Sequence, residues 1–272
     1  MNLAGLPERP VIGVLHPGAM GAAVGSALKP VAGAVIWAAA GRSTTTSQRA
    51  EVADLVGVPD LAELARRADV IISICPPHAA RDVAEQVSVA LAARPELPLY
   101  VDANAVSPAT VQSIGALLGA DRVVDGSIIG PPAWEPGRTV LWLSGAAADA
   151  VAELFAGSPF AAQVLGADLG AASALKACFG LQSKAVLAVW PALAVAARGY
   201  GVEDALRAEL ARTGVDYAAE FDDAVARAGT KAWRWVGEME EAADALAAIG
   251  VPDGFSRAAA EVYRRMAQAG LS

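Results

Sequence analysis

Cysteine and histidine, the residues that most often build disulfides and metal sites, are scarce in this chain. Its 272 residues include two cysteines, Cys75 and Cys178, and two histidines, His16 and His78. The cysteines lie in different predicted elements, and these residues do not have the spacing of a zinc site. We therefore expect a reduced, cytoplasmic protein without a metal centre.

Basic residues are also few relative to acidic ones. The chain has 21 Lys and Arg against 29 Asp and Glu, a formal net charge of -8, and no stretch is dense in positive charge. Because binding to nucleic-acid phosphates needs a cationic face, a nucleic-acid partner is disfavoured.

The sequence gives no signal for secretion or for a membrane. Residues 1–10 have neither a basic start nor an apolar core, so we expect no signal peptide. The most apolar later run, residues 185–197, is shorter than a spanning helix and contains Pro191. We interpret this run as a buried helix.

Apolar residues are what the chain has in abundance. Hydrophobic residues make up 55% of it and charged residues 18%, a composition typical of a folded chain. In the first half, short apolar runs alternate with Ala-rich helical stretches, which predicts an α/β Rossmann domain with a mostly parallel, doubly wound sheet. The predicted strands are 11–15, 34–37, 70–75, 99–102, 123–124 and 139–143, and the predicted helices include 18–28, 48–56, 79–93 and one opened by Ser107 and Pro108.

The pattern changes after Leu165. From Gly170 to the end, helical stretches are separated by glycines, and no strand-like alternation is left. We predict a Rossmann domain over residues 1–167 and an all-α domain over residues 168–272. The second domain would begin with a long interdomain helix at about residues 171–197.

The turn after the first predicted strand resembles a dinucleotide-binding turn. Gly18 and Gly21 fill the second and third glycine positions of that fingerprint, while His16 occupies the first. Such glycines let backbone amides at a helix N-terminus approach a pyrophosphate. A glycine pair after a strand is otherwise only a tight turn, but its place at the start of a βαβ series favours the first interpretation. The predicted cofactor contacts here are Pro17, Gly18, Ala19, Met20 and Gly21.

The end of the second predicted strand favours NADP over NAD. Residues 30–50 contain no acidic side chain, whereas an NAD site normally has one there for the ribose hydroxyls. Arg42, Ser43 and Thr44 stand there instead, and a guanidinium with hydroxyls suits a 2′-phosphate. The alternative is a solvated turn.

A third loop should lie beside the cofactor. Ligands of open α/β sheets bind at the carboxyl ends of strands, which here places Cys75, Pro76 and Pro77 near the nucleotide. We interpret Cys75 as a small buried residue rather than a nucleophile.

Several segments together resemble the β-hydroxyacid dehydrogenase superfamily, which includes 6-phosphogluconate dehydrogenase, 3-hydroxyisobutyrate dehydrogenase and the imine reductases. The resemblance covers nearly the whole chain, and its C-terminal part is similar to a branch whose helical domain has no characterised function. The similar segments are residues 11–21, 69–77, 101–108, 125–130, 170–176 and 232–241.

This resemblance implies specific roles. Members have a lysine six residues after a glycine at the start of the interdomain helix, and Gly170 and Lys176 match, so Lys176 would be the general acid/base. A lysine in an apolar helix would be partly desolvated, which brings its pKa towards the working pH. The alternative is a lysine that extends from the helix into water. Asn104 stands where members place a polar residue that touches the nicotinamide ribose or the substrate.

The chain also departs from the family pattern. An asparagine one turn after the lysine is replaced by Gly180, and a Ser-Gly-Gly substrate loop is replaced by Ile129-Gly130-Pro131. Lys184, two turns after Lys176, would approach the same pocket or face solvent. These departures argue against a standard 3-hydroxyacid substrate.

The C-terminal helical stretches complete the expected site. By analogy with the family, Trp235, Glu238 and Met239 would line the substrate side together with Ile129, Gly130, Gly180 and Lys184. The resemblance also implies a homodimer. Other dehydrogenase signatures are absent, since no tyrosine is followed by lysine at the Tyr-x-x-x-Lys spacing and His78 is the last histidine.

The leading hypothesis is an NADP-dependent oxidoreductase that transfers hydride between NADPH and a small carbonyl or hydroxy compound. Two alternatives stay open: imine reductase-type C=N reduction, and an NADP-binding redox sensor without turnover. The substitutions at Ile129 and Gly180 favour the sensor.

Overall fold

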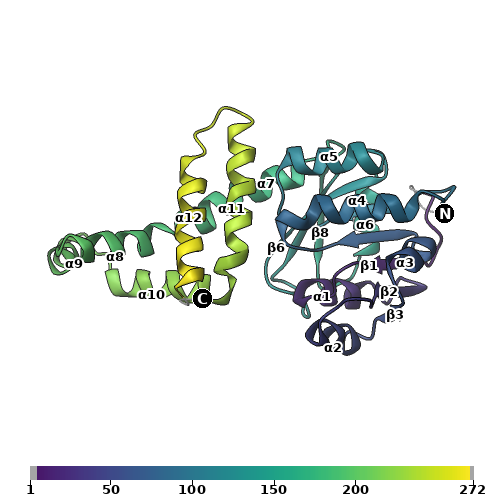
Figure 1. Ribbon diagram of the computed structural model, residues 1–272, viewed down its shortest axis with the longest axis horizontal. Coiled ribbons are helices and arrows are strands. Elements are labelled where there is room, and N and C mark those ends of the chain that lie inside the picture. The colour runs from purple at the N-terminus through teal and green to yellow at the C-terminus, as the bar shows by residue number, and fades with distance from the viewer. Residues whose placement is uncertain (1–4, 270–272) are drawn as a thin grey trace. The chain divides into compact units, whose positions relative to one another are not determined.

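A computed structural model describes residues 5–269 (Figure 1). The chain divides into two compact units, the first ending at Lys176 and the second beginning at Ala177. The predicted boundary at residues 167–168 lies just before the helix in which this division falls. Each unit is considered separately below.

The first unit contains one eight-stranded sheet with the order β3-β2-β1-β4-β5-β6-β7-β8. Its strand pairs are parallel except for β6 and β7, which are antiparallel. This sheet and the helices after it confirm the predicted α/β Rossmann fold followed by an all-helical region. The strands are β1 (Val11–Val14), β2 (Ala34–Ala38), β3 (Val56–Val58), β4 (Val70–Ser73), β5 (Leu99–Asp102), β6 (Val123–Ile129), β7 (Val140–Ser144) and β8 (Ala161–Gly166).

Helices cover both faces of this sheet (Figure 1). On one face, α1 (Ala19–Leu28), α2 (Thr44–Val52) and α6 (Ala148–Leu154) contribute to one hydrophobic core. On the other face, α3 (Leu61–Arg67), α4 (Ala80–Leu91) and α5 (Pro108–Leu118) contribute to a second core. Strands buried on both faces explain why β1, β4 and β5 are continuous apolar runs in the sequence.

Two strands were not predicted, and one helix is shifted. The helix expected at residues 48–56 spans α2 instead, because Ser43 caps its N-terminus by accepting the Thr46 N–H at 3.2 Å. The helix ends at Val52, and Asp54 adopts a positive φ of 54°, so residues 56–58 form β3. The edge strand β8 is mostly exposed and therefore lacks the apolar alternation that marks a strand.

The second unit is built from helices. Its core lies between the C-terminal helices and the segment after Lys176, with Trp235, Met239 and Tyr263 as its largest members. The helices are the π-helical turn η2 (Leu181–Ala185), α8 (Val189–Gly199), α9 (Glu203–Arg212), α10 (Tyr217–Ala228), the short 3₁₀ helix η3 (Gly229–Lys231), α11 (Ala232–Ala247) and α12 (Gly254–Gln268).

The longest helical stretch joins α7 (Ala171–Gly180), η2 and α8. Among residues 5–269, this stretch, Ala171–Gly199, is the one helix long and apolar enough to cross a membrane by length and composition, and 33% of its most apolar window is buried. A core helix of a soluble protein can pass the same test of length and composition. Pro191 lies in the first turn of α8, where its missing N–H is tolerated. The run predicted to be a buried helix is buried on one side only, because Val186, Val189 and Val195 are exposed.

Candidate functional site

The glycine turn between β1 and α1 leads into a helix whose N-terminus has no side-chain cap. Gly18 is the N-cap of α1, donates its N–H to the carbonyl oxygen of His16 at 2.8 Å, and has open space on its side-chain side. A side chain at Gly21 would place its Cβ 2.1 Å from the same carbonyl oxygen, so only glycine fits there. No side chain caps α1, and its first turn contains no acidic residue. Its first N–H groups are thus available to an anion, as the fingerprint predicts.

The loop after β2 contributes a basic group to the same edge of the sheet. Strands β1 and β2 pair in parallel, so the turn and this loop follow neighbouring carboxyl ends. Arg42 is half-buried, burial lowers the pKa of its guanidinium, and its Nε lies 3.4 Å from the Ala38 carbonyl oxygen. Ser43 and Thr44 are exposed at the start of α2. Arg42 and these hydroxyls therefore follow the carboxyl end of β2, and their contact with a 2′-phosphate stays a prediction.

The loop after β4 is tied to the end of β5 through Asn104. The Asn104 Oδ1 accepts the Cys75 N–H at 2.6 Å, and its Nδ2 donates to Ser73 Oγ at 3.2 Å and to Asp102 Oδ2 at 2.9 Å. Asn104 is only 2% exposed. In this structure its amide thus holds two strand ends in register, and a direct contact with cofactor or substrate stays a prediction.

Cys75 is half-buried, less enclosed than the buried position that the sequence interpretation expects. Burial, followed by the nearby Asp102 carboxylate, raises the pKa of its thiol to about 12. The thiol is therefore protonated at neutral pH and is a poor nucleophile. Next to it, Pro76 is half-buried and Pro77 begins the short 3₁₀ helix η1 (Pro77–Ala79).

A buried carboxylate fixes the start of α7. Asp125, in the middle of β6, accepts the Ser173 N–H at 2.8 Å and the Ser173 hydroxyl at 2.7 Å. Ser144 of β7 donates its hydroxyl to Asp125 at 3.2 Å and accepts the Ala172 N–H at 3.1 Å. These bonds join two strands to the N-terminus of the helix and satisfy its free N–H groups. Sequence reasoning missed this role, although an aspartate within an apolar strand signals a need for partners.

Lys176 lies one turn further along α7. It is half-buried, and its Nζ donates to the Ile128 carbonyl oxygen of β6 at 3.1 Å. Ile129, the last residue of this strand, is half-buried. The next residue, Gly130, has a φ of 135°, and the Arg138 carbonyl oxygen is 2.5 Å from where a Cβ would lie. The first unit therefore brings Lys176 beside the strand end that carries Ile129 and Gly130.

The second unit brings its own predicted residues into one cluster. Lys184 and Glu238 form an ion pair with side chains 17% and 10% exposed, and Arg234 Nε lies 3.1 Å from the other Glu238 oxygen. The Lys184 Nζ also lies 5.7 Å from the centroid of the Trp235 ring. Met239 is buried next to Gly180, where a Cβ would lie 3.2 Å from the Met239 Cε. Gly180 thus makes room for Met239 instead of orienting a substrate through a side chain.

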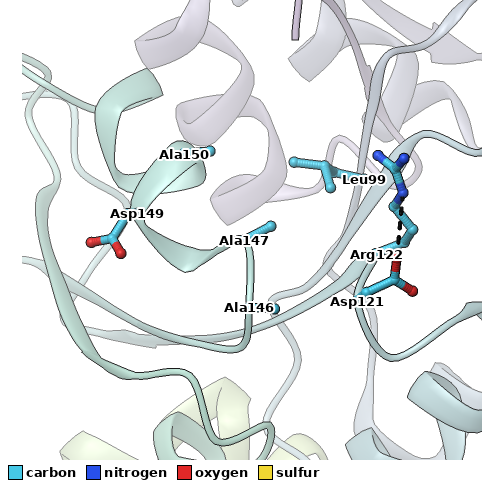
Figure 2. Close-up of a pocket in the computed structure, with 7 residues that line it drawn as sticks. All are labelled: Leu99, Asp121, Arg122, Ala146, Ala147, Asp149 and Ala150. Atoms are coloured by element: carbon cyan, nitrogen blue, oxygen red, sulfur yellow. Dashed lines mark ion pairs between the residues drawn. The ribbon is translucent and has the colours of Figure 1, made fainter. Parts of the chain in front are cut away.

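A hollow of about 420 Å³ lies at a different edge of the first unit. Figure 2 shows the side chains that line it. The hollow lies at the amino end of β5, beside the residues that precede β6 and the start of α6. Within it, the Arg122 Nε lies 3.9 Å from the Asp121 Oδ2. Ligands of open α/β sheets bind at the carboxyl edge, so this hollow is separate from the candidate site. No cluster of three potential metal ligands occurs among residues 5–269.

Solved structures with the same fold cover nearly the whole chain. The Mycobacterium tuberculosis 3-hydroxyisobutyrate dehydrogenase, solved with L-serine, is 21% identical with a TM-score of 0.68, over 96% of this chain and 94% of that one. A conserved hypothetical protein from Sinorhizobium meliloti is 23% identical with a TM-score of 0.67, over 97% and 90%. The Aspergillus terreus reductive aminase, solved with NADPH and ethyl levulinate, is 17% identical with a TM-score of 0.55, over 96% and 95%.

These similarities show the fold, a Rossmann unit followed by a helical unit, which the chain shares with structures of a 3-hydroxyisobutyrate dehydrogenase and an imine reductase. This confirms the resemblance seen in the sequence at the level of the fold. Residues 197–266 match the family model of a domain of unknown function, DUF1932. A search of curated proteins gave no match.

Proposed function

We propose that this chain is an NADP-dependent oxidoreductase that transfers hydride between NADPH and a small carbonyl or hydroxy compound, with Lys176 as the general acid/base. The observation that carries the proposal is the carboxyl edge of the sheet in the first unit. There the glycine turn, Arg42 and Lys176 follow or adjoin the ends of β1, β2 and β6.

The turn and the β2 loop fit a phosphorylated dinucleotide. Gly18 leaves space for a pyrophosphate at uncapped helix N–H groups, and Arg42 is a half-buried cation that forms no ion pair within 4.0 Å among residues 5–269. The Aspergillus terreus reductive aminase, which shares this fold, is solved with NADPH. When bound, NADPH would supply the hydride. The remaining proton transfer would fall to the protein.

Two features support a role for Lys176 in that proton transfer. Its Nζ already donates to a strand carbonyl, which orients the ammonium, and the Asp125 network fixes the helix that bears it. In the direction of reduction, Lys176 would donate a proton to the substrate oxygen as hydride reaches the carbon. In the direction of oxidation it would accept that proton.

Reduction of a C=N bond is the second candidate. Imine reductase and reductive aminase structures share the fold, with the Streptomyces aurantiacus imine reductase at 22% identity and a TM-score of 0.50. The substitution of Ile129 for a substrate-binding serine favours a less polar substrate than a hydroxyacid. The predicted substrate contacts of the second unit are Lys184, Trp235, Glu238 and Met239, with Gly180 beside Met239.

A substrate panel tests the proposal. NADPH consumption would be followed against aldehydes, ketoacids and imines, with binding of NADPH and NADH measured separately. Lys176→Met should lower kcat by about 100-fold or more, the usual contribution of general acid–base catalysis, and leave NADPH binding unchanged. Lys29→Met, which removes a lysine paired with Asp54 outside the site, serves as the matched control.

The outcomes separate the hypotheses. Binding of NADPH without turnover of any substrate would support the redox sensor and remove the catalytic role of Lys176. No affinity for either dinucleotide would remove the oxidoreductase proposal as a whole.

We also propose a homodimer. The face of α8 and α12 carries exposed apolar side chains, including Val189 and Phe255, around an apolar groove of about 450 Å³. Groups of exposed apolar residues of this kind typically mark protein–protein contacts.

A further inference from the structure

His16 occupies the first position of the glycine turn, where the dinucleotide fingerprint has glycine. Its carbonyl oxygen accepts the Gly18 N–H and closes the turn. The ring is half-buried, and its Nδ1 is buried without a hydrogen-bond partner in the described part of the chain. Leaving a buried polar atom unpaired costs free energy, so native proteins rarely keep one without a reason. The orphaned nitrogen marks a ring whose hydrogen-bonding capacity the described part of the chain does not fully use.

Arg42 follows the end of β2, the strand that pairs in parallel with β1, and its charge acts on His16. Burial, followed by the nearby positive charge of Arg42, lowers the pKa of His16 to about 4. Burial also lowers the pKa of Arg42 itself. No acidic side chain of residues 5–269 forms an ion pair with Arg42 within 4.0 Å; its one side-chain hydrogen bond is to the Ala38 carbonyl oxygen. The His16 and Arg42 side chains are thus both half-buried, and no acidic side chain of the described residues pairs with Arg42.

The surrounding elements supply no negative charge to this pair. Helix α1 and strands β1, β2 and β4 contain no acidic or basic side chain, and their serine hydroxyls are uncharged. In the loop after β4, Cys75 has a pKa of about 12 and is neutral, and His78 is exposed. On α2, Arg49 and Glu51 are both exposed. The arrangement therefore favours an anion that arrives from solution.

We propose that His16 is a phosphate-binding residue that acts with Arg42 to select a dinucleotide bearing a phosphomonoester on its adenosine ribose, and that it takes up a proton from solvent as this phosphate binds. The inference rests on the proposed NADP site and names a contact that the fingerprint does not contain. In the free protein the imidazole is neutral beside the guanidinium. In the complex the dianionic phosphate offsets both positive charges, and the imidazolium donates a hydrogen bond to a phosphate oxygen.

The sign of the pH dependence follows from this change. The pKa of His16 is about 4 in the free protein and is higher in the complex, so binding takes up a proton between these two values. NADPH affinity should therefore fall as pH rises through the pKa of His16 in the complex. NADH lacks the phosphomonoester, so its affinity should not respond to His16.

The experiment is a binding titration of NADPH and of NADH from about pH 6.5 to about pH 8.5, a range in which a phosphate monoester is mostly dianionic. It compares the wild type with His16→Asn and with His16→Gly, which restores the glycine of the fingerprint. His78→Asn, a change at the other, exposed histidine, is the matched control. Calorimetry in two buffers of different ionisation enthalpy counts the protons taken up.

We expect His16→Asn and His16→Gly to bind NADPH about tenfold more weakly near neutral pH, the usual effect of losing a hydrogen bond to a charged group, with NADH affinity unchanged. Both variants should take up fewer protons than the wild type on binding NADPH. His78→Asn should behave as the wild type in every titration.

A second measurement does not depend on the stability of the variants. With two histidines in the chain, the ring C–H signals of His16 can be assigned in the wild type by comparison with His78→Asn. The His16 signal should not titrate above about pH 5.5 in the free protein, given its pKa of about 4, and should titrate at higher pH with NADPH bound.

Four outcomes would overturn the inference. Equal loss of NADPH and NADH affinity would give His16 a role in turn geometry alone. An unchanged His16 titration with NADPH bound would exclude proton uptake by this ring. If the wild type bound neither dinucleotide, the proposed function would fail and this inference with it, whereas NADPH binding that does not depend on His16 overturns this inference only.

Discussion

At the scale of single residues, the two cysteines should differ sharply in reactivity. Burial raises the pKa of Cys75 to about 12, with the Asp102 carboxylate as the second cause, whereas Cys178 is exposed on α7. Only thiolate reacts readily, so N-ethylmaleimide at about pH 7.5 should label Cys178 and leave Cys75 unmodified, as read by peptide mass spectrometry. In Cys178→Ser, labelling should require denaturant. Rapid labelling of Cys75 in the folded protein would contradict this environment.

The types of residue in the candidate site could be predicted from the sequence, but their hydrogen-bond partners could not. The glycine pair and the absence of an acidic residue after β2 are visible in the sequence, because they depend on neighbours along the chain. The bonds of Asn104 to Ser73 and Asp102, and the unpaired nitrogen of His16, depend on packing between separate strands. Such contacts cannot be predicted from the residues next to each position in the sequence.

At the scale of elements, Asp125 should control the start of α7 and, through it, the position of Lys176. Asp125→Ala leaves the Ser173 N–H and both serine hydroxyls without their buried acceptor, which should destabilise the first unit by about 1–3 kcal/mol. Urea unfolding measures this change, and kcat should fall more than KM rises because the lysine is displaced. Asp149→Asn, at an exposed aspartate of α6 (Figure 2), is the matched control and should change neither. Equal stability of Asp125→Ala and the control would remove the capping role.

Elements with buried apolar faces were predictable, and those without them were not. Strands β1, β4 and β5 are apolar runs bounded by turn residues, whereas β3 has three residues and an exposed Val56, and β8 is an exposed edge. Pairing with β2 and β7 forms these two strands, and pairing is a property of the sheet rather than of the segment. The same reason applies to the ion pair of Lys184 and Glu238, which joins two helical segments far apart in the sequence.

At the scale of the whole molecule, the proposed dimer can be tested through its apolar face. Phe255 at the start of α12 is 72% exposed and lines the groove beside Val189 of α8. Exposed apolar side chains around a groove gain from burial by a second chain, whereas a buried unpaired charge there is costly. Phe255→Glu should therefore convert a dimer to a monomer at micromolar concentration, measured by light scattering after gel filtration.

A charge introduced elsewhere separates this effect from a general loss of association. Val52 ends α2 and is 82% exposed, but it lies in the first unit and outside the groove. Val52→Glu should leave the mass in solution unchanged, because the substitution adds the same charge without entering the proposed contact. A wild-type protein with the mass of one chain would exclude the dimer. A dimer that both variants preserve would place its interface on another face.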